Sequence, residues 1–251
     1  MKNHNSHVFS ICFDDGNFEF LDGYAPGDVV SLRDINVFRR VSKILRLKVG
    51  DRFILFNDKS NIEGCLVSFE RKDTISFEIL GIDKNQVVVP RIKIFVGFTK
   101  KLALENIAYY AAQLGVESLH LISSDRVQRK WGGKKELERL RAVMRSAREQ
   151  AKSFCEPEVF EPCKLGDVEF GKNDLEIVFE SSSDEHIKNL WRAHKNVESS
   201  SIFFGPEGGF SCDELSFLEK KGVKSYSLLS AVLRTQEAVL LGAGSIISMF
   251  S

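Results

Sequence analysis

Hydrophobic and polar positions divide the chain into two parts with different periods. In the first third, short runs of β-branched and aromatic residues are separated by Gly, Asp and Asn, a pattern typical of β-strands. A helix-like segment over residues 36–47 interrupts them, with apolar residues on one face and basic residues on another. Short strands around one helix predict a small β-barrel. The strands are expected over 7–13, 52–56, 62–69 and 74–80.

The pattern changes after residues 83–91, which we interpret as a linker. Apolar runs of strand length now alternate with amphipathic helical segments, of which 102–114 and 134–152 are the clearest. This alternation predicts βαβ units and a mostly parallel sheet. We therefore expect a barrel over 1–82 and an α/β domain over 92–251. The strands of the second part are expected over 92–98, 119–122, 175–179, 202–204 and 225–229.

Composition and charge narrow the class of protein. The 251 residues carry 35 Lys and Arg against 35 Asp and Glu, so the net charge is zero and bulk charge does not indicate a nucleic-acid partner. The five cysteines form no C-x-x-C pair, which argues against a zinc site or a disulfide framework. Residues 1–10 are polar, and the most apolar segment, 238–250, is shorter than the roughly 20 residues that span a bilayer. These features predict a cytoplasmic protein with no metal and no membrane partner.

The segment SIFFGPEGGFSCDEL, residues 201–215, carries the most specific local pattern. An apolar strand stops at Gly205, two further glycines follow, and Ser211 with Glu214 matches the S-x-x-E capping box that opens a helix. Glycines at a strand end allow positive φ and let a ligand approach the backbone in front of a helix N-terminus. In an open α/β sheet, ligands bind at the carboxyl ends of the strands. The loop is therefore a candidate binding site, although a simple Gly-rich turn would have the same sequence.

The spacing of this loop excludes two phosphate-binding motifs. It matches neither G-x-G-x-x-G nor G-x-x-x-x-G-K-[ST], and no lysine follows it, so a nucleoside suits it better than a triphosphate. A second strand-end loop precedes Thr235, which we expect to be the N-cap of the last helix. Two such loops can form a cleft between them. The small residues Ala238, Gly242 and Gly244 in that last helix indicate close packing in the core.

Two motifs resemble the signature of a known family. FGPEGGFS at residues 204–211 and LRTQEAV at 233–239 are similar to motifs of the RsmE family, SPOUT-class enzymes that methylate N3 of a uridine in small-subunit ribosomal RNA. The segments VSKILRLKVGD (41–51), QLGVESLHLISSDR (113–126) and AREQAKSFCEP (147–157) also resemble blocks of that family. The resemblance covers most of the chain.

The resemblance implies a fold, a cofactor and partners. The fold would be a PUA-like, RNA-binding β-barrel followed by a SPOUT α/β domain with a C-terminal trefoil knot and a mostly parallel sheet. The chain would be a homodimer that uses S-adenosylmethionine as methyl donor and acts on ribosomal RNA or the small ribosomal subunit. By position, the cofactor would be lined by Phe204, Gly205, Glu207, Gly208, Gly209, Leu228, Leu233 and Thr235.

Several positions depart from the family pattern near the expected chemistry. The Gly-Pro-Arg usual before LRT is replaced at residues 229–231, Gln236 stands where the family has glutamate, and Ser153 and Tyr110 stand where it has basic residues. Two other functions therefore stay open. One is an RNA-binding protein that keeps the fold with weakened or lost turnover, and the other is a SPOUT methyltransferase for a different RNA base.

Methyl transfer to uracil N3 requires loss of a weakly acidic proton. We expect Arg234 to place positive charge near the developing uracil anion, while Glu237 is a weaker candidate for the proton acceptor. For Arg234 the alternative is a structural salt bridge between the two loops.

Basic residues cluster in three places that could contact phosphate groups. One cluster lies on the helix of the barrel, one at the tip of a strand, and one in the segment 126–133, where Trp131 could stack on a base. A basic helix face can also be simply solvated. The predicted RNA-binding residues are Arg39, Arg40, Lys43, Arg46, Lys100, Lys101 and Arg126.

Overall fold

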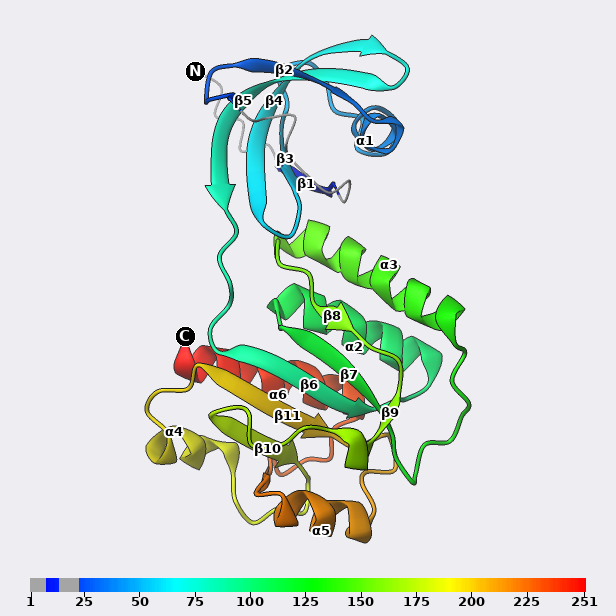
Figure 1. The fold of residues 1–251 in the computed structure, drawn as a ribbon, viewed down its shortest axis with the longest axis vertical. Coiled ribbons are helices and arrows are strands. Elements are labelled where there is room, and N and C mark those ends of the chain that lie inside the picture. The colour runs from blue at the N-terminus through cyan, green and yellow to red at the C-terminus, as the bar shows by residue number, and fades with distance from the viewer. Residues whose placement is uncertain (1–7, 14–22) are drawn as a thin grey trace. The chain divides into compact units, whose positions relative to one another are not determined.

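A computed structural model describes residues 8–13 and 23–251, which form two compact units (Figure 1). The first unit contains the described residues up to Gln86 together with Arg148–Cys155. The second contains Val87–Ala147 and Glu156–Ser251. The boundary after Gln86 falls within the expected linker. The segment 148–155, in contrast, packs with the first unit and not with the 92–251 domain to which the sequence pattern assigned it.

The first unit is built on a five-stranded sheet in the order β1-β3-β4-β5-β2. The strands β1 and β3 pair in parallel, and the other neighbours are antiparallel. Alternate side chains of the strands, with Val37 and Val41, form its core. The strand bounds are β1 Phe9–Cys12, β2 Val29–Arg33, β3 Arg52–Phe56, β4 Ser60–Arg71 and β5 Thr74–Lys84. The pattern missed β2, and position 7 of the expected first strand lies outside the described residues.

The helical segment of this unit is shorter than the pattern predicts. The helix α1 covers Ile35–Arg39, and the π-helical turn η2 continues it over Arg40–Ile44. Asp34 caps α1 by accepting a hydrogen bond from the Val37 backbone N–H at 2.7 Å. The turn becomes π-helical because the Leu45 N–H donates to the carbonyl of Arg40, five residues back.

Charged side chains at the end of α3 (Lys134–Ala151) explain why the segment 148–155 belongs to the first unit. Arg148 is 1% exposed, donates to the Phe154 carbonyl at 2.5 Å and lies 5.2 Å from the centre of the Phe56 ring. The Glu149 carboxylate accepts from the Cys12 backbone N–H at 3.0 Å and pairs with Arg40. Buried charges of this kind need their partners, and β1 and η2 of the first unit supply those of Glu149.

The second unit is built on a sheet in which every pairing is parallel (Figure 1). The strand order is β12-β10-β11-β6-β7-β8, and β9 also pairs with β7. This confirms the predicted α/β class. The expected strand over 225–229 is shorter and ends at Tyr226. The bounds are β6 Arg91–Gly97, β7 Ser118–Ser123, β8 Glu158–Val159, β9 Cys163–Lys164, β10 Leu175–Phe179, β11 Ser199–Phe204 and β12 Lys224–Tyr226.

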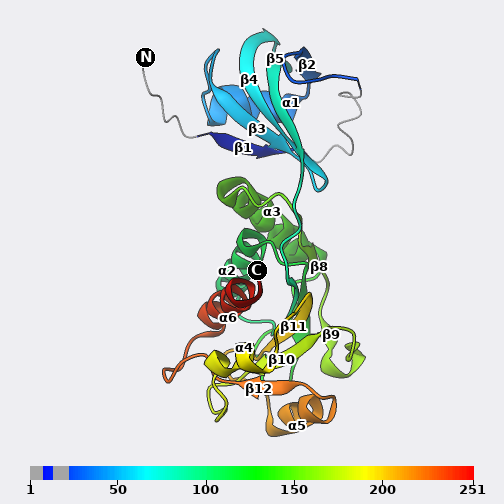
Figure 2. The same cartoon turned by 90° about the vertical axis from the view of Figure 1, so that its left-hand side faces the viewer.

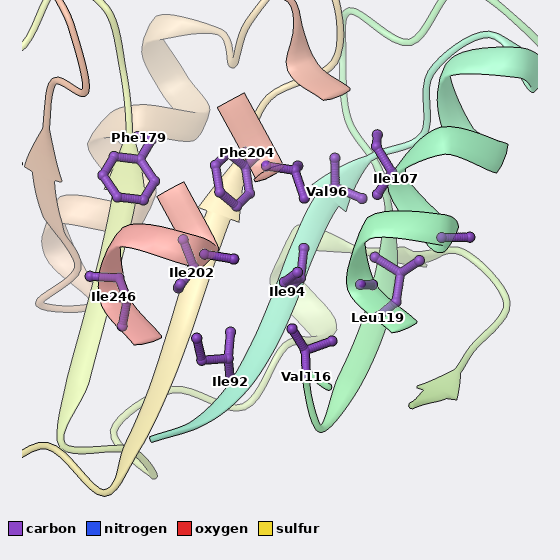
Figure 3. Close-up of a cluster of buried hydrophobic side chains, with 14 of the residues drawn as sticks. Ile92, Ile94, Val96, Ile107, Val116, Leu119, Phe179, Ile202, Phe204 and Ile246 are labelled. Carbon is purple, nitrogen blue, oxygen red and sulfur yellow. The ribbon is translucent and has the colours of Figure 1, made fainter. Parts of the chain in front are cut away.

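Helices cover both faces of this sheet, which explains why its central strands are apolar runs (Figure 2). On one face, β6 contributes Ile92, Ile94 and Val96 to a core shared with α2 and α6 (Figure 3). On the other face, α5 contributes Leu218 to a smaller cluster. The longer helices are α2 Lys101–Leu114, α3, α5 Cys212–Lys220 and α6 Thr235–Phe250, and the short ones are η3 Leu165–Asp167, η4 Ile187–Asn189 and α4 Leu190–Ala193. None of the helices in the described ranges is long and apolar enough to cross a membrane.

Five aromatic rings stack in a row across this second face, in the order Phe160, His120, Phe95, Phe203 and Phe170. Neighbouring ring centres lie 4.6, 4.5, 4.7 and 5.6 Å apart, and the interplanar angles are 13–16°. Burial lowers the pKa of His120 to about 4, and the positive charge of Lys93 adds to the effect. The imidazole is therefore neutral at physiological pH and stacks as an aromatic ring.

This lowered pKa predicts a loss of stability in acid. Between pH 6.5 and about 4, the unfolded chain binds a proton at His120 and the folded protein does not, so the free energy of unfolding falls as the pH falls. His120→Phe keeps a stacked ring and removes this contribution. Denaturant unfolding at pH 7 and pH 5 should therefore show a smaller loss for the variant than for the wild type. Equal losses would contradict the assignment, and Ser118→Ala, which removes only the hydroxyl beside the imidazole, should behave like the wild type.

Candidate functional site

The Gly-rich loop between β11 and α5 folds back on itself in a way that requires bare backbone. A Cβ on Gly205 would lie 2.7 Å from the Gly209 Cα, and a Cβ on Gly97, at the end of β6, would lie 2.5 Å from the Pro206 Cδ. Gly209 has φ +68°, in the left-handed region that favours glycine. The glycines are thus needed for the loop's own packing, whether or not a ligand is bound.

The predicted capping box at the start of α5 is confirmed. The Ser211 hydroxyl accepts from the Glu214 backbone N–H at 3.2 Å, and the Glu214 carboxylate accepts from the Ser211 N–H at 2.7 Å. The loop after β7 joins this cap, because the Asp125 backbone N–H donates to Glu214 at 3.0 Å and its carboxylate accepts from the Ser211 hydroxyl at 2.8 Å. These bonds fix the exit of the Gly-rich loop.

The second loop, between β12 and α6, meets the first through one side chain. The Thr235 Oγ1 donates to the Gly205 carbonyl at 3.2 Å. Thr235 is the first residue of α6, and Arg234, with φ −69° and ψ 156°, is the N-cap, so the expectation that Thr235 caps the helix was wrong. Its hydroxyl serves the neighbouring loop instead. The two sequence motifs thus lie side by side.

Together the two loops border an open cavity of about 280 Å³ at the carboxyl ends of β10 and β11. All eight residues that the resemblance assigned to a cofactor line it. Lining residues that the sequence analysis did not assign to the cofactor come mainly from the end of β10 and from the tip of the second loop. They are Phe179, Glu180, Ser181, Pro206, Leu229, Ala231, Val232 and Ala238.

One signal could have identified the β10 residues. Ligands in parallel sheets contact the ends of neighbouring strands, and β10 pairs directly with β11. The cavity combines apolar walls from Leu228 and Leu233 with backbone groups of the glycines and the carboxylates of Glu180 and Glu207. This combination suits a ligand that has both a flat apolar ring and a cationic group.

The two predicted catalytic residues lie differently with respect to this cavity. Arg234 is exposed and stands between the lining residues Leu233 and Thr235. Glu237 does not line the cavity but a second hollow along α6, and its carboxylate accepts from the Gln236 side-chain amide at 2.8 Å. The structure therefore brings Arg234, and not Glu237, to the edge of the cavity.

Two of the predicted RNA-binding residues have partners inside the protein. Arg40 pairs with the buried Glu149, and its contact with RNA stays a prediction. Arg126 donates to the Gly208 carbonyl at 2.8 Å, beside the cavity. The remaining predicted side chains are exposed on α1, η2 and the start of α2. They are Arg39, Lys43, Arg46, Lys100 and Lys101.

The loop around Trp131 is not the free stacking loop that the sequence suggested. Trp131 is partly buried and packs against the core of the second unit. The Arg129 guanidinium pairs with Glu136 at 2.5 Å, and it lies 5.2 Å from the centre of the Phe98 ring. Both side chains are thus part of the fold. No group of three or more His, Cys, Asp or Glu within the described residues is arranged to hold a metal ion.

Known proteins resemble the chain in sequence and in fold. It is 28% identical to ribosomal RNA small subunit methyltransferase E of Aquifex aeolicus over 85% of this chain and 92% of that protein. It is 24% identical to the protein of the same name in Mycobacterium bovis over 90% of this chain and 89% of that one. The ribosomal RNA small subunit methyltransferase E of Neisseria gonorrhoeae, solved bound to S-adenosyl methionine, superposes with a TM-score of 0.79 at 20% identity over 97% of this chain and 98% of that one. The family model of the RNA methyltransferase domain matches residues 87–247, most of the chain, so this protein belongs to the RNA methyltransferase domain family.

Proposed function

We propose that this protein transfers a methyl group from S-adenosylmethionine to N3 of a uridine in small-subunit ribosomal RNA. The observation that carries the proposal is the single cavity formed where the Gly205 carbonyl meets the Thr235 hydroxyl, since both family motifs contribute its walls. The names of the relatives, ribosomal RNA small subunit methyltransferase E, support the choice of RNA.

The residues that line the cavity fit this cofactor. Gly209 leaves no side chain between the Gly-rich loop and Glu180, Leu228 and Leu233 offer apolar surface to an adenine ring, and Glu180 offers negative charge to a cation. When bound, S-adenosylmethionine supplies a methyl group on a positively charged sulfur, which is already a strong donor. The protein's task is then to orient the uracil and to stabilise its N3 anion.

Arg234 is the residue best placed to stabilise that anion. It is the N-cap of α6, at the rim of the cavity, and its charge adds to the partial positive charge of the helix N-terminus. In the part of the chain that the structure describes, Arg234 forms no ion pair. This favours the electrostatic role over a structural salt bridge between the loops.

The reaction itself is tested with purified protein, labelled S-adenosylmethionine and small ribosomal subunits from a strain that lacks this protein. We expect 3-methyluridine in the digested RNA, located by mass spectrometry at one nucleotide. If the label were found in another nucleoside, the protein would methylate a different base and the uridine proposal would be wrong. RNA binding without label would favour the protein that keeps the fold and has lost turnover.

Arg234→Ala should separate turnover from cofactor binding. Because the guanidinium acts on the uracil, kcat should fall by about 100-fold or more while the Kd for S-adenosylmethionine changes less than about twofold. Single-turnover methylation and calorimetry measure the two quantities. Arg192→Ala, at an exposed arginine of α4, is the control and should leave both unchanged. Equal losses of turnover and affinity would contradict the assignment.

We further propose that the first unit is a PUA-like, RNA-binding barrel in which Arg39, Lys43 and Arg46 contact phosphate groups. These three side chains are exposed on α1, on η2 and just after it. Lys100, Lys101 and Arg126 would extend the basic surface of the second unit beside Glu207 and Gly208.

Reversing the charge at Arg39 and Arg46 should weaken RNA binding through electrostatics alone. Each lost phosphate contact lowers the slope of log K against log salt by about 0.7–0.9, so Arg39→Glu with Arg46→Glu should lower it by roughly 1.5. Filter binding of ribosomal RNA at several KCl concentrations measures the slope. Lys59→Glu with Lys72→Glu, at exposed residues in the turns before and after β4, makes the same change in net charge and is the matched control. An unchanged slope in the double variant would refute the contacts.

We also propose a cytoplasmic homodimer with a trefoil knot in its C-terminal part. The apposition of residues 205–211 and 228–235 supports the knot implied by the resemblance. On α6, Leu240 and Leu241 are more than a third exposed, beside a hollow that includes Gly244 and Met249. Such an apolar helix face suits a second copy. Sedimentation equilibrium measures the mass, and a monomer would exclude the dimer.

A further inference from the structure

The charged residues that line the cavity are all acidic. They are Glu180 and Glu207, and no Lys, Arg or His of residues 8–13 and 23–251 lines the cavity. The nearest basic groups of the two loops are placed outside the lining: Arg126 is bonded to the Gly208 carbonyl, and Arg234 is exposed at the helix N-cap. A cationic ligand therefore suits this cavity better than an anionic one.

The two carboxylates are not equivalent. Glu207 is exposed, and its Oε1 accepts from the Lys100 backbone N–H at 3.0 Å. Glu180 is half-buried, and its backbone N–H donates to the Tyr226 carbonyl at 3.0 Å, which fixes it at the end of β10. A Cβ built on Gly209 would lie 3.8 Å from the Glu180 Oε2, so this oxygen faces the Gly-rich loop with no side chain between them.

We propose that Glu180 makes the cavity selective for the positively charged, sulfonium form of the cofactor over the uncharged thioether product. This inference rests on the proposed function. S-Adenosylmethionine and S-adenosylhomocysteine share the ribose, the adenine and the amino acid group, and they differ by one methyl group and one positive charge at sulfur. The attraction between this charge and a half-buried carboxylate is stronger than the attraction between the same two charges in bulk water. After methyl transfer the attraction disappears, which favours exchange of product for fresh cofactor.

Glu180 could instead bind a group that both molecules carry, such as a ribose hydroxyl or the ammonium group. In that case its loss would weaken both ligands equally. The distinguishing quantity is therefore the ratio of the two dissociation constants and not either constant alone.

The test is calorimetry of the full chain with S-adenosylmethionine and with S-adenosylhomocysteine at low salt. The wild type should bind the sulfonium more tightly, by about fivefold or more. Glu180→Gln should weaken sulfonium binding by about tenfold and product binding by less than about twofold. Glu219→Gln, at an exposed glutamate of α5 outside the cavity, makes the same change in net charge and should alter neither.

Each other outcome overturns the proposal. Equal weakening of the binding of both ligands would show that Glu180 contacts a group that they share. Unchanged binding of both would show that Glu180 does not contact the cofactor. If the wild type binds neither ligand, the proposed cofactor itself fails. If Glu180→Gln does not fold, the salt dependence of binding to the wild type is measured instead. Added KCl should weaken the binding of S-adenosylmethionine and leave that of S-adenosylhomocysteine nearly constant. Equal weakening of both ligands by KCl would contradict the proposal.

Discussion

Close backbone approach at three glycines is the constraint on which the second unit depends. Gly97 ends β6 against Pro206, Gly205 lets the Gly-rich loop turn back on itself, and Gly242 lets α6 approach the sheet. A Cβ on Gly242 would lie 2.7 Å from the Phe179 ring and 3.0 Å from the Phe204 ring, both of which line the cavity. The ends of β10 and β11, the Gly-rich loop and the start of α6 are thus brought together around the cavity.

This constraint also explains how the two motifs act as one. With the backbones this close, the Thr235 hydroxyl reaches the Gly205 carbonyl, and the N-terminus of α6 points into the same region. Both loops line the cavity, and the second also carries Arg234, for which we propose the role of stabilising the uracil anion. The altered residues 229–231 lie in the second loop, where Leu229 and Ala231 still line the cavity.

Local signals predicted local structure well. Short apolar runs predicted the central strands, and Ser211 with Glu214 predicted the start of α5, because both depend on residues a few positions apart. Contacts between distant residues were not predictable in the same way. Arg40 looked like its neighbours on a basic helix face, yet its partner Glu149 lies 109 positions along the chain. The same long-range pairing moved residues 148–155 into the first unit, and no composition change in the sequence marks that boundary.

The departure at Gln236 has a consequence for the proposed dimer face. Its side chain accepts from Asn106 at 3.2 Å and donates to the Glu237 Oε1 at 2.8 Å, which holds that carboxylate beside the hollow of α6. The Glu237 Oε2 is buried and has no hydrogen-bond partner among the residues that the structure describes. An unpaired carboxylate oxygen costs on the order of 1–3 kcal/mol or more. If a second copy covered this hollow with apolar side chains alone, the oxygen would still lack a partner and the dimer would keep this unfavourable free energy. A stable homodimer through α6 therefore requires either a donor from the second copy or water at Glu237, and the apolar surface of Leu240 and Leu241 has to supply the attraction.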